Sequence, residues 1–174
     1  MDKPILDATC GGRMMWFDKH NPDCLFVDKR TVPEMHLCDG RAFSVEPDLI
    51  ADFTDLPFCD DTFYLAVFDP PHLKDIGENA YMAIKYGRLP GGWQDVIRGG
   101  FAECMRVLKP HGTLIFKWNE TQISTKEIIE TIGQEPLFGH KSGKAAKTNW
   151  MVFMKGERNA NRDTRSDAGD KRHC

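Results

Sequence analysis

The sequence of 174 residues contains no apolar run that approaches the ~20 residues a membrane-spanning helix needs. Its first residues also lack the pattern of a secretory signal peptide, so we expect a cytoplasmic protein that does not bind membranes. Positive charge is not in excess either, because the formal net charge is −3. A general attraction to polyanions is therefore excluded, and affinity for nucleic acid would require a local cluster of lysine and arginine.

Cysteine pairs are also absent. The six cysteines include no Cys-x-x-Cys spacing, which excludes the common structural zinc motifs. His36 and Cys38 are close enough along the chain to share a metal ion, but no second pair completes a site, and we predict no metal centre. The cysteines are expected to be small buried apolar residues in a reducing compartment.

The composition predicts one folded domain. With 41% hydrophobic and 28% charged residues the chain is ordinary for a globular protein, and we place the domain at residues 1–155. Residues 156–174 carry charges of both signs and no large apolar side chain, so they predict a mobile C-terminal tail. Residues 73–95 are a long, irregular connection, which is typical of a lid or a substrate-binding loop.

Four short apolar runs in the first 70 residues each end in an aspartate, at Asp7, Asp28, Asp52 and Asp69. The runs do not alternate with polar residues, which predicts strands of a parallel sheet that helices cover on both faces. In such α/β sheets, ligands bind in the crevice beyond the carboxyl ends of the strands. The four aspartates therefore mark a candidate binding edge.

The second half of the chain predicts helices and more strands. Residues 91–112 place apolar side chains at helical spacing and end in a Lys-Pro-x-Gly stop. Ser124 and Glu127 have the spacing of a capping box at the start of a short helix. Further strands are expected at 112–118, 136–141 and 149–155, the last two joined by a basic loop as a hairpin.

A glycine turn, Asp-Ala-Thr-Cys-Gly-Gly-Arg, follows the first predicted strand. Glycine permits a tight turn and the close approach of a ligand, although the chain lacks the Gly-x-Gly-x-x-Gly pattern of dinucleotide binding. Asp28 can accept hydrogen bonds from ribose hydroxyls, and Asp52 beside Phe53 can meet an adenine amine and ring. Taken singly, the glycine turn can be purely structural and each aspartate can be a solvated strand end. Their occurrence together at the ends of successive predicted strands favours a nucleoside ligand.

The motifs ILDATCGG, VDKR, ADFTDLPFCDDTFYLAVFDPPH and RVLKPHGTLIFKW resemble, in this order, those of class I S-adenosylmethionine-dependent methyltransferases. The resemblance extends from about Pro4 to Lys155. It implies a Rossmann-like α/β fold with a seven-stranded sheet in the order 3-2-1-4-5-7-6, the seventh strand antiparallel, and S-adenosyl-L-methionine as cofactor. It further implies three groups of cofactor-binding residues: Asp7, Ala8, Thr9, Cys10, Gly11 and Gly12 around the methionine part, Asp28 on the ribose, and Asp52 with Phe53 on the adenine.

The tetrad from Asp69 to His72, Asp-Pro-Pro-His, resembles the Asp-Pro-Pro-Tyr motif of nucleic-acid amino-methyltransferases. The resemblance implies that Asp69 and the Pro70 carbonyl accept the two hydrogens of an exocyclic amine, while Pro70 and Pro71 keep that carbonyl fixed. In those enzymes the fourth residue is aromatic and stacks on a base swung out of its helix. His72 stands there in this chain, and imidazole can stack, donate a hydrogen bond or accept a proton.

The methyl acceptor implied by this resemblance is an exocyclic amine of a nucleic-acid base, with adenine N6 in DNA favoured over cytosine N4 and RNA adenine. DNA would then be the partner, bound in a salt-dependent manner by basic side chains. Two other hypotheses remain: a methyltransferase for a small molecule or a protein, which the acidic body favours, and a non-catalytic module that binds the cofactor or a partner. The candidate phosphate-binding residues are Lys85, Arg88, Lys141, Lys144 and Lys147.

Overall fold

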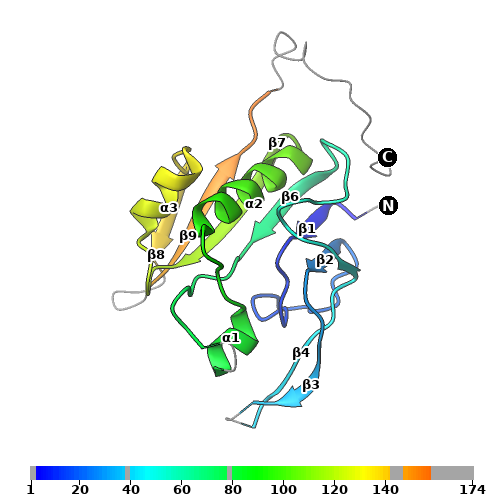
Figure 1. Cartoon of the computed structure of the whole chain (residues 1–174). Coiled ribbons are helices and arrows are strands. Elements are labelled where there is room, and N and C mark those ends of the chain that lie inside the picture. Colours follow the sequence, from blue (N-terminus) through cyan, green and yellow to red (C-terminus); the bar gives the residue numbers. More distant parts are fainter. Residues whose placement is uncertain (1–2, 38–39, 78–79, 142–146, 158–174) are drawn as a thin grey trace.

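The computed structural model of the chain describes residues 3–37, 40–77, 80–141 and 147–157. A seven-stranded sheet forms its centre, in the order β5-β2-β1-β6-β7-β9-β8 (Figure 1). These strands are β1 (Ile5–Asp7), β2 (Cys24–Asp28), β5 (Leu49–Ile50), β6 (Phe63–Phe68), β7 (Leu108–Asn119), β8 (Phe138–Lys141) and β9 (Thr148–Met154). Two more strands, β3 (Val32–His36) and β4 (Ala42–Val45), form a separate hairpin.

The strand order confirms the expectation once the hairpin is set aside. Numbered along the chain without β3 and β4, the seven strands have the order 3-2-1-4-5-7-6. Neighbours from β5 to β7 are parallel, whereas β9 is antiparallel to both β7 and β8. Leu6 pairs with Ala66, and Phe68 pairs with Phe116. The carboxyl ends of β1, β6 and β7 therefore meet at one edge of the sheet.

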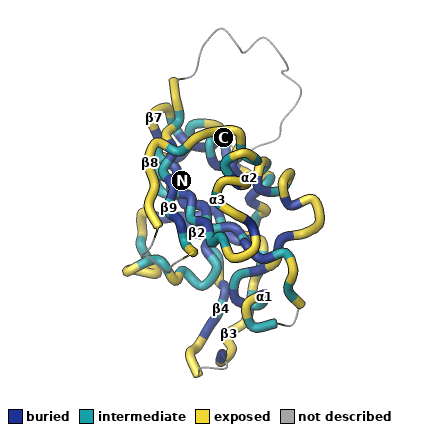
Figure 2. The backbone as a smooth tube through the Cα atoms, turned by 90° about the vertical axis from the view of Figure 1, so that its left-hand side faces the viewer, coloured by how far each residue is buried: buried dark blue, intermediate teal, exposed yellow. Residues whose placement is uncertain are grey.

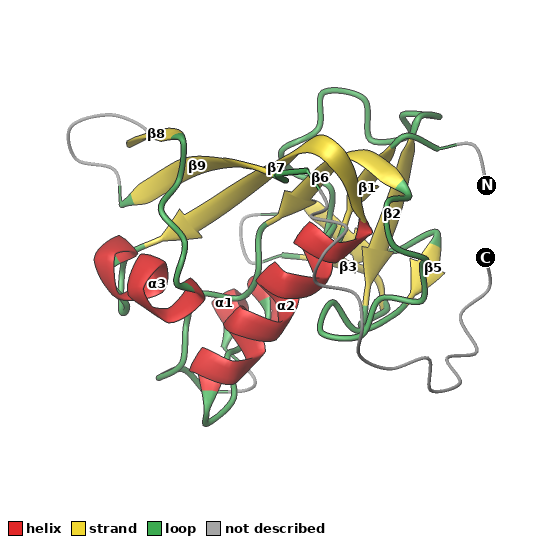
Figure 3. Cartoon of the chain, turned by 90° about the horizontal axis from the view of Figure 1, so that it is seen from above, coloured by secondary structure: helices red, strands yellow, loops and turns green. Residues whose placement is uncertain are grey.

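Two helices cover one face of this sheet, as Figure 3 shows: α2 (Trp93–Val107) and α3 (Thr125–Ile132). The predicted helical spacing is confirmed, because Ile97, Phe101 and Cys104 are buried in α2. The Ser124 hydroxyl accepts a hydrogen bond from the Glu127 N–H at 3.2 Å, so the predicted cap is confirmed as well. Aromatic side chains from the sheet, including Phe68 and Phe116, fill the core beneath the helices.

The opposite face differs from the expectation, because no helix of the described ranges covers it. The connections that would carry such helices contain helix breakers. Residues 8–23 hold two adjacent glycines and a proline and form turns. The connection between β2 and β5 contains the strands β3 and β4 of the hairpin. In β7, Leu114 and Phe116 are buried under the helices, while Ile115 between them is only partly buried on the other face.

One smaller expectation is also corrected. The third strand, β5, ends at Ile50 rather than at Asp52. The Asp52 carboxylate accepts hydrogen bonds from the backbone N–H and the hydroxyl of Thr54, at 2.9 and 2.8 Å, which turns the chain after Ala51. This turn directs Phe53 into the core.

The expected lid, residues 73–95, is more ordered than its sequence indicates. It contains the short helix α1 (Tyr81–Tyr86), and the Leu89 N–H donates to the Leu73 carbonyl at 2.9 Å. Both leucines are buried. In Figure 2 buried backbone runs through the sheet, whereas β3 of the hairpin is largely exposed. Among the helices of the described residues, none has the length and apolar character that crossing a membrane requires.

Candidate functional site

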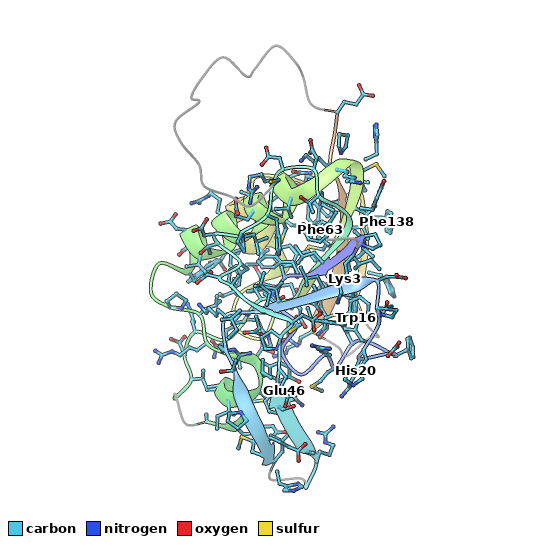
Figure 4. The ribbon with its side chains drawn as sticks, turned by 90° about the vertical axis from the view of Figure 1, so that its right-hand side faces the viewer. Lys3, Trp16, His20, Glu46, Phe63 and Phe138 are labelled. Carbon is cyan, nitrogen blue, oxygen red and sulfur yellow. The ribbon has the colours of Figure 1, made fainter. Side chains whose placement is uncertain are left out.

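Asp7 holds the glycine turn from below. Its Oδ1 accepts a hydrogen bond from the Thr9 N–H at 3.2 Å, and its Oδ2 accepts one from the Trp16 indole N–H at 2.7 Å. Only 1% of Asp7 is exposed, and burial raises the pKa of its carboxyl to about 7. Trp16 is labelled in Figure 4 and stacks edge-on against Phe26. Asp7 is therefore placed to fix the turn rather than to line a pocket.

The turn itself is joined to the end of β2. Gly11 has φ +48°, in the region that favours glycine, and its N–H donates to the Asp28 carboxylate at 3.0 Å. The other Asp28 oxygen accepts from the backbone N–H of Arg30 at 2.9 Å. A Cβ atom at Gly11 would meet no atom within 4 Å, whereas one at Gly12 would lie 2.8 Å from the Phe43 ring of the hairpin. The turn thus faces open space on one side and the hairpin on the other.

One pocket of about 380 Å³ lies at the carboxyl ends of β1, β2, β6 and β7. It lies where a parallel α/β sheet binds its ligands. Most residues expected to bind the cofactor line it: Ala8, Thr9, Cys10, Gly11, Gly12, Asp28 and Phe53. Asp7 lies beneath the turn, and Asp52 points to Thr54 and to Lys29, whose Nζ is 3.7 Å away. Lys29 also lies over the Phe53 ring.

The Asp-Pro-Pro-His tetrad brings half of its residues to this pocket. Asp69 and Pro71 line it, but Pro70 and His72 do not. The Asp69 N–H donates to the Thr9 hydroxyl at 2.8 Å, which ties the tetrad to the glycine turn. The Asp69 carboxylate lies 2.5 Å from the Lys117 ammonium of β7. Burial raises the pKa of Asp69, and Lys117 opposes this shift by favouring the carboxylate.

His72 does not line the pocket, where its ring is expected to form a stacking surface. Only 9% of the residue is exposed, and its ring packs 5.7 Å from Tyr86 and 6.4 Å from Trp118. Burial, together with the nearby Lys117 charge, lowers the pKa of His72 to about 4. The imidazole is therefore neutral at physiological pH and buttresses the Tyr86 ring.

The pocket lining also includes residues that are not among the predicted site residues, and three of them carry chemistry: Lys117, Tyr86 and Trp150. Lys117 and Trp150 are cross-strand partners in β7 and β9, and the Lys117 ammonium lies 5.7 Å from the centre of the Trp150 ring. Alternation along β7 contains a signal for Lys117, because it falls between buried Phe116 and Trp118 at the carboxyl end of a strand. No comparable local signal marks Tyr86.

The expected phosphate-binding cations separate into two groups. Lys85 and Arg88 line the pocket, as part of the segment that follows the tetrad. Lys141 instead pairs with Glu120 at 2.5 Å, and Lys147 is exposed and does not line the pocket. Lys144 falls outside the described residues.

Solved structures share this architecture over most of the chain. A SAM-dependent methyltransferase of Methanosarcina mazei superposes with a TM-score of 0.53 at 11% identity, covering 88% of this chain and 92% of its own. A TehB-like SAM-dependent methyltransferase of Corynebacterium glutamicum superposes with a TM-score of 0.52 at 14% identity, covering 90% of this chain and 81% of its own. A protein of Pyrococcus horikoshii superposes with a TM-score of 0.53 at 16% sequence identity, covering 88% of this chain and 81% of its own.

These likenesses show that the chain has the Rossmann-like fold of SAM-dependent methyltransferases. No protein-family model matches the sequence, and no curated protein matches it significantly. Function must therefore be argued from the site.

Proposed function

We propose that the protein is an S-adenosylmethionine-dependent methyltransferase that acts on an exocyclic amine of a nucleic-acid base, with adenine N6 in DNA favoured. One observation carries the proposal: a single pocket joins the glycine turn, Asp28 and Phe53 to Asp69 and Pro71. The first three suit a nucleoside cofactor, and the last two suit the acceptor of the group that the cofactor donates.

The residues present fit this cofactor. The Asp28 carboxylate accepts from Gly11 and Arg30 and retains lone pairs for ribose hydroxyls. Phe53 offers an apolar wall for an adenine ring, and the space beside Gly11 admits the chain that continues from the ribose. Bound there, S-adenosylmethionine supplies an electrophilic methyl group on a sulfonium ion. Asp52 lies outside this pocket and is left with a role in shaping the turn before Phe53.

Asp69 would orient the acceptor. An aromatic amine is a poor nucleophile because its lone pair is delocalised into the ring, and hydrogen bonds from its N–H groups to fixed oxygens direct the lone pair outward. The Asp69 carboxylate supplies one such oxygen in the pocket. The resemblance assigns the second to the carbonyl of Pro70, which lies between Asp69 and Pro71 in the chain but does not itself line the pocket. On transfer the sulfur–methyl bond would break and leave its electron pair on sulfur, giving S-adenosylhomocysteine, while the nitrogen would gain the methyl group and release one proton, which Asp69 is placed to accept.

The stacking surface for a base would come from Tyr86 and Trp150 rather than from His72. Both rings line the pocket, and His72 supports Tyr86 from behind at a ring distance of 5.7 Å. Stacking of a base on an aromatic ring contributes about 1–3 kcal/mol and tolerates any base. The presence of histidine at position 72, where the resembling enzymes have Tyr, Phe or Trp, is thus compatible with a planar acceptor.

The test is transfer of a radiolabelled methyl group from S-adenosylmethionine to DNA, RNA and protein in parallel. Asp69→Asn should abolish transfer and retain binding of S-adenosylhomocysteine, whereas Asp28→Asn should weaken that binding. Label on protein or RNA with none on DNA would reject the favoured acceptor. If the unmodified protein does not bind S-adenosylhomocysteine, the cofactor assignment is wrong.

A second candidate follows from the ion pair at the reaction centre. Lys117 lies 2.5 Å from Asp69, where it competes with an incoming amine and opposes the positive charge that methylation builds on nitrogen. The same ammonium would stabilise an anionic oxygen, such as a phenolate or a carboxylate. This favours a small-molecule oxygen acceptor as the alternative, and label transfer to acidic small molecules but not to polymers would support it.

A further inference from the structure

The β3–β4 hairpin builds a second pocket beside the first. Its buried residues Leu37, Phe43 and Val45 form a cluster that also packs against Tyr81 of α1. Because Phe43 also contacts Gly12, the hairpin bridges the glycine turn and α1. Between them lies a pocket of about 570 Å³, and His20 and Glu46, two of its lining residues, flank the base of the hairpin in Figure 4.

The two pockets are continuous. Gly11, Gly12, Met14 and Lys85 line both of them, so one ligand, or two ligands in contact, can extend from Asp69 past the glycine turn to the hairpin. Lys85 alone among these four carries a charge. Its position at the junction makes it the residue that either occupant would meet.

Lys85 is a buried cation that has no anionic partner among the described residues. Only 7% of the residue is exposed. Within the described residues its ammonium has no hydrogen-bond or ion-pair partner and lies 5.1 and 5.8 Å from the centres of the Tyr86 and Tyr81 rings. The ring faces compensate part of the cost of removing this charge from water. A full compensation needs hydrogen-bond acceptors, preferably anionic oxygens, which the pockets leave room for.

We propose that the second pocket is a binding site for an anionic oxygen group, a carboxylate or a phosphate, and that Lys85 anchors it. The walls of the second pocket carry acidic side chains, Glu34, Glu46 and Asp48, as well as basic ones, Arg13, Lys19 and Arg41. Arg13 pairs with Asp48 at 3.0 Å, whereas Lys85 lines both pockets, which places the anion at the junction beside Lys85. Under the proposed function two molecules offer this chemistry: the amino-acid carboxylate of the cofactor and a phosphate of the acceptor. The binding of an anion itself does not depend on that function.

The experiment measures binding by calorimetry to matched pairs of probes. S-Adenosylhomocysteine is compared with methylthioadenosine, which lacks the amino-acid end, and deoxyadenosine monophosphate is compared with deoxyadenosine. The variant Lys85→Met removes the charge and keeps the length of the stem, Lys85→Arg keeps the charge, and Lys126→Met removes an exposed lysine of α3 as the control. Thermal unfolding verifies that each variant folds.

We expect Lys85→Met to weaken the binding of at least one anionic probe by about tenfold or more and to leave the affinity for its neutral counterpart unchanged. A loss of affinity for S-adenosylhomocysteine identifies the cofactor carboxylate as the anion that Lys85 binds. A loss of affinity for the nucleotide identifies the acceptor phosphate. Lys85→Arg should retain most of the affinity. Equal affinities of wild type and folded Lys85→Met for all four probes would overturn the proposal. Loss on the nucleotide without any binding of S-adenosylhomocysteine by wild type would retain the anion site and reject the proposed cofactor.

Discussion

The buried carboxyl of Asp7 should make the stability of the protein depend on pH in a direction opposite to that of most aspartates. Its pKa rises from 3.8 to about 7 on folding, chiefly through burial. Between these values the native protein holds a proton that the unfolded chain has lost. The free energy of unfolding therefore falls as the pH rises through this window, and this contribution is constant above it.

The magnitude follows from the size of the shift. About three pH units at ~1.4 kcal/mol each give an upper bound of about 4 kcal/mol between pH 4 and 7. Asp7→Asn removes the ionisation and keeps the shape of the side chain. The amide has only one acceptor oxygen, so either Thr9 or Trp16 loses its partner at a cost of about 1–3 kcal/mol. This cost does not vary with pH.

The assay is urea unfolding of wild type and Asp7→Asn at intervals from pH 4 to 9. The difference in unfolding free energy should move in favour of the variant by up to about 4 kcal/mol between pH 4 and 7 and then level off. The other titrating groups occur in both proteins, so their contributions largely cancel in the difference between the two unfolding free energies. Two curves that remain parallel over this range would refute the assignment of a raised pKa to Asp7.

Three further predictions concern the core and the reaction centre. In a urea titration, Gly100→Ala should lower the free energy of unfolding by about 1–3 kcal/mol, because the added Cβ would lie 2.5 and 2.7 Å from two core phenylalanine rings. Gly99→Ala is the control. Its Cβ would lie 3.8 Å from the nearest atom, so this variant should be neutral or stabilising in the same titration. Lys117→Met should move the acidic limb of the pH profile of the transfer rate to higher pH, because it removes the charge that lowers the pKa of Asp69 and favours its ionised form. An unchanged profile would contradict this. Tyr86→Ala should raise the KM for the nucleic-acid acceptor about tenfold and leave cofactor affinity unchanged, whereas Tyr64→Ala at an exposed strand position should alter neither.

The strands and their common edge were accessible from the sequence because local signals determine them. Short apolar runs ending at Asp7, Asp28 and Asp69 are strands in the structure, or end directly before the aspartate, and parallel pairing brings their ends together. The prediction that Asp52 ends the third strand and faces the ligand differs from the structure for an equally local reason. Its carboxylate bonds to the next turn, so the strand stops short and only Phe53 reaches the pocket.

The side chains that complete the site could not be found in the same way. Tyr86 and Trp150 are far apart in the sequence and converge only through the packing of the segment after the tetrad and the pairing of β9 with β7. His72 was selected by its position after the prolines, but the direction of its side chain depends on the space between Tyr86 and Trp118. Packing at this range has no signature in a local motif.

The hairpin does leave a signal in the sequence, and its consequence extends beyond one connection. Two short β-prone runs flank the Asp-Gly pair at residues 39–40, the strongest short-range indication of a hairpin, and Gly40 has φ +80°. A doubly wound sheet would use this connection for a helix that covers the sheet. Here the hairpin projects past the carboxyl ends of the strands (Figure 1). Among the described residues it therefore leaves one sheet face without a helix, and it adds a wall to the binding edge. The presence of a hairpin in place of a helix accounts both for that face and for the second pocket.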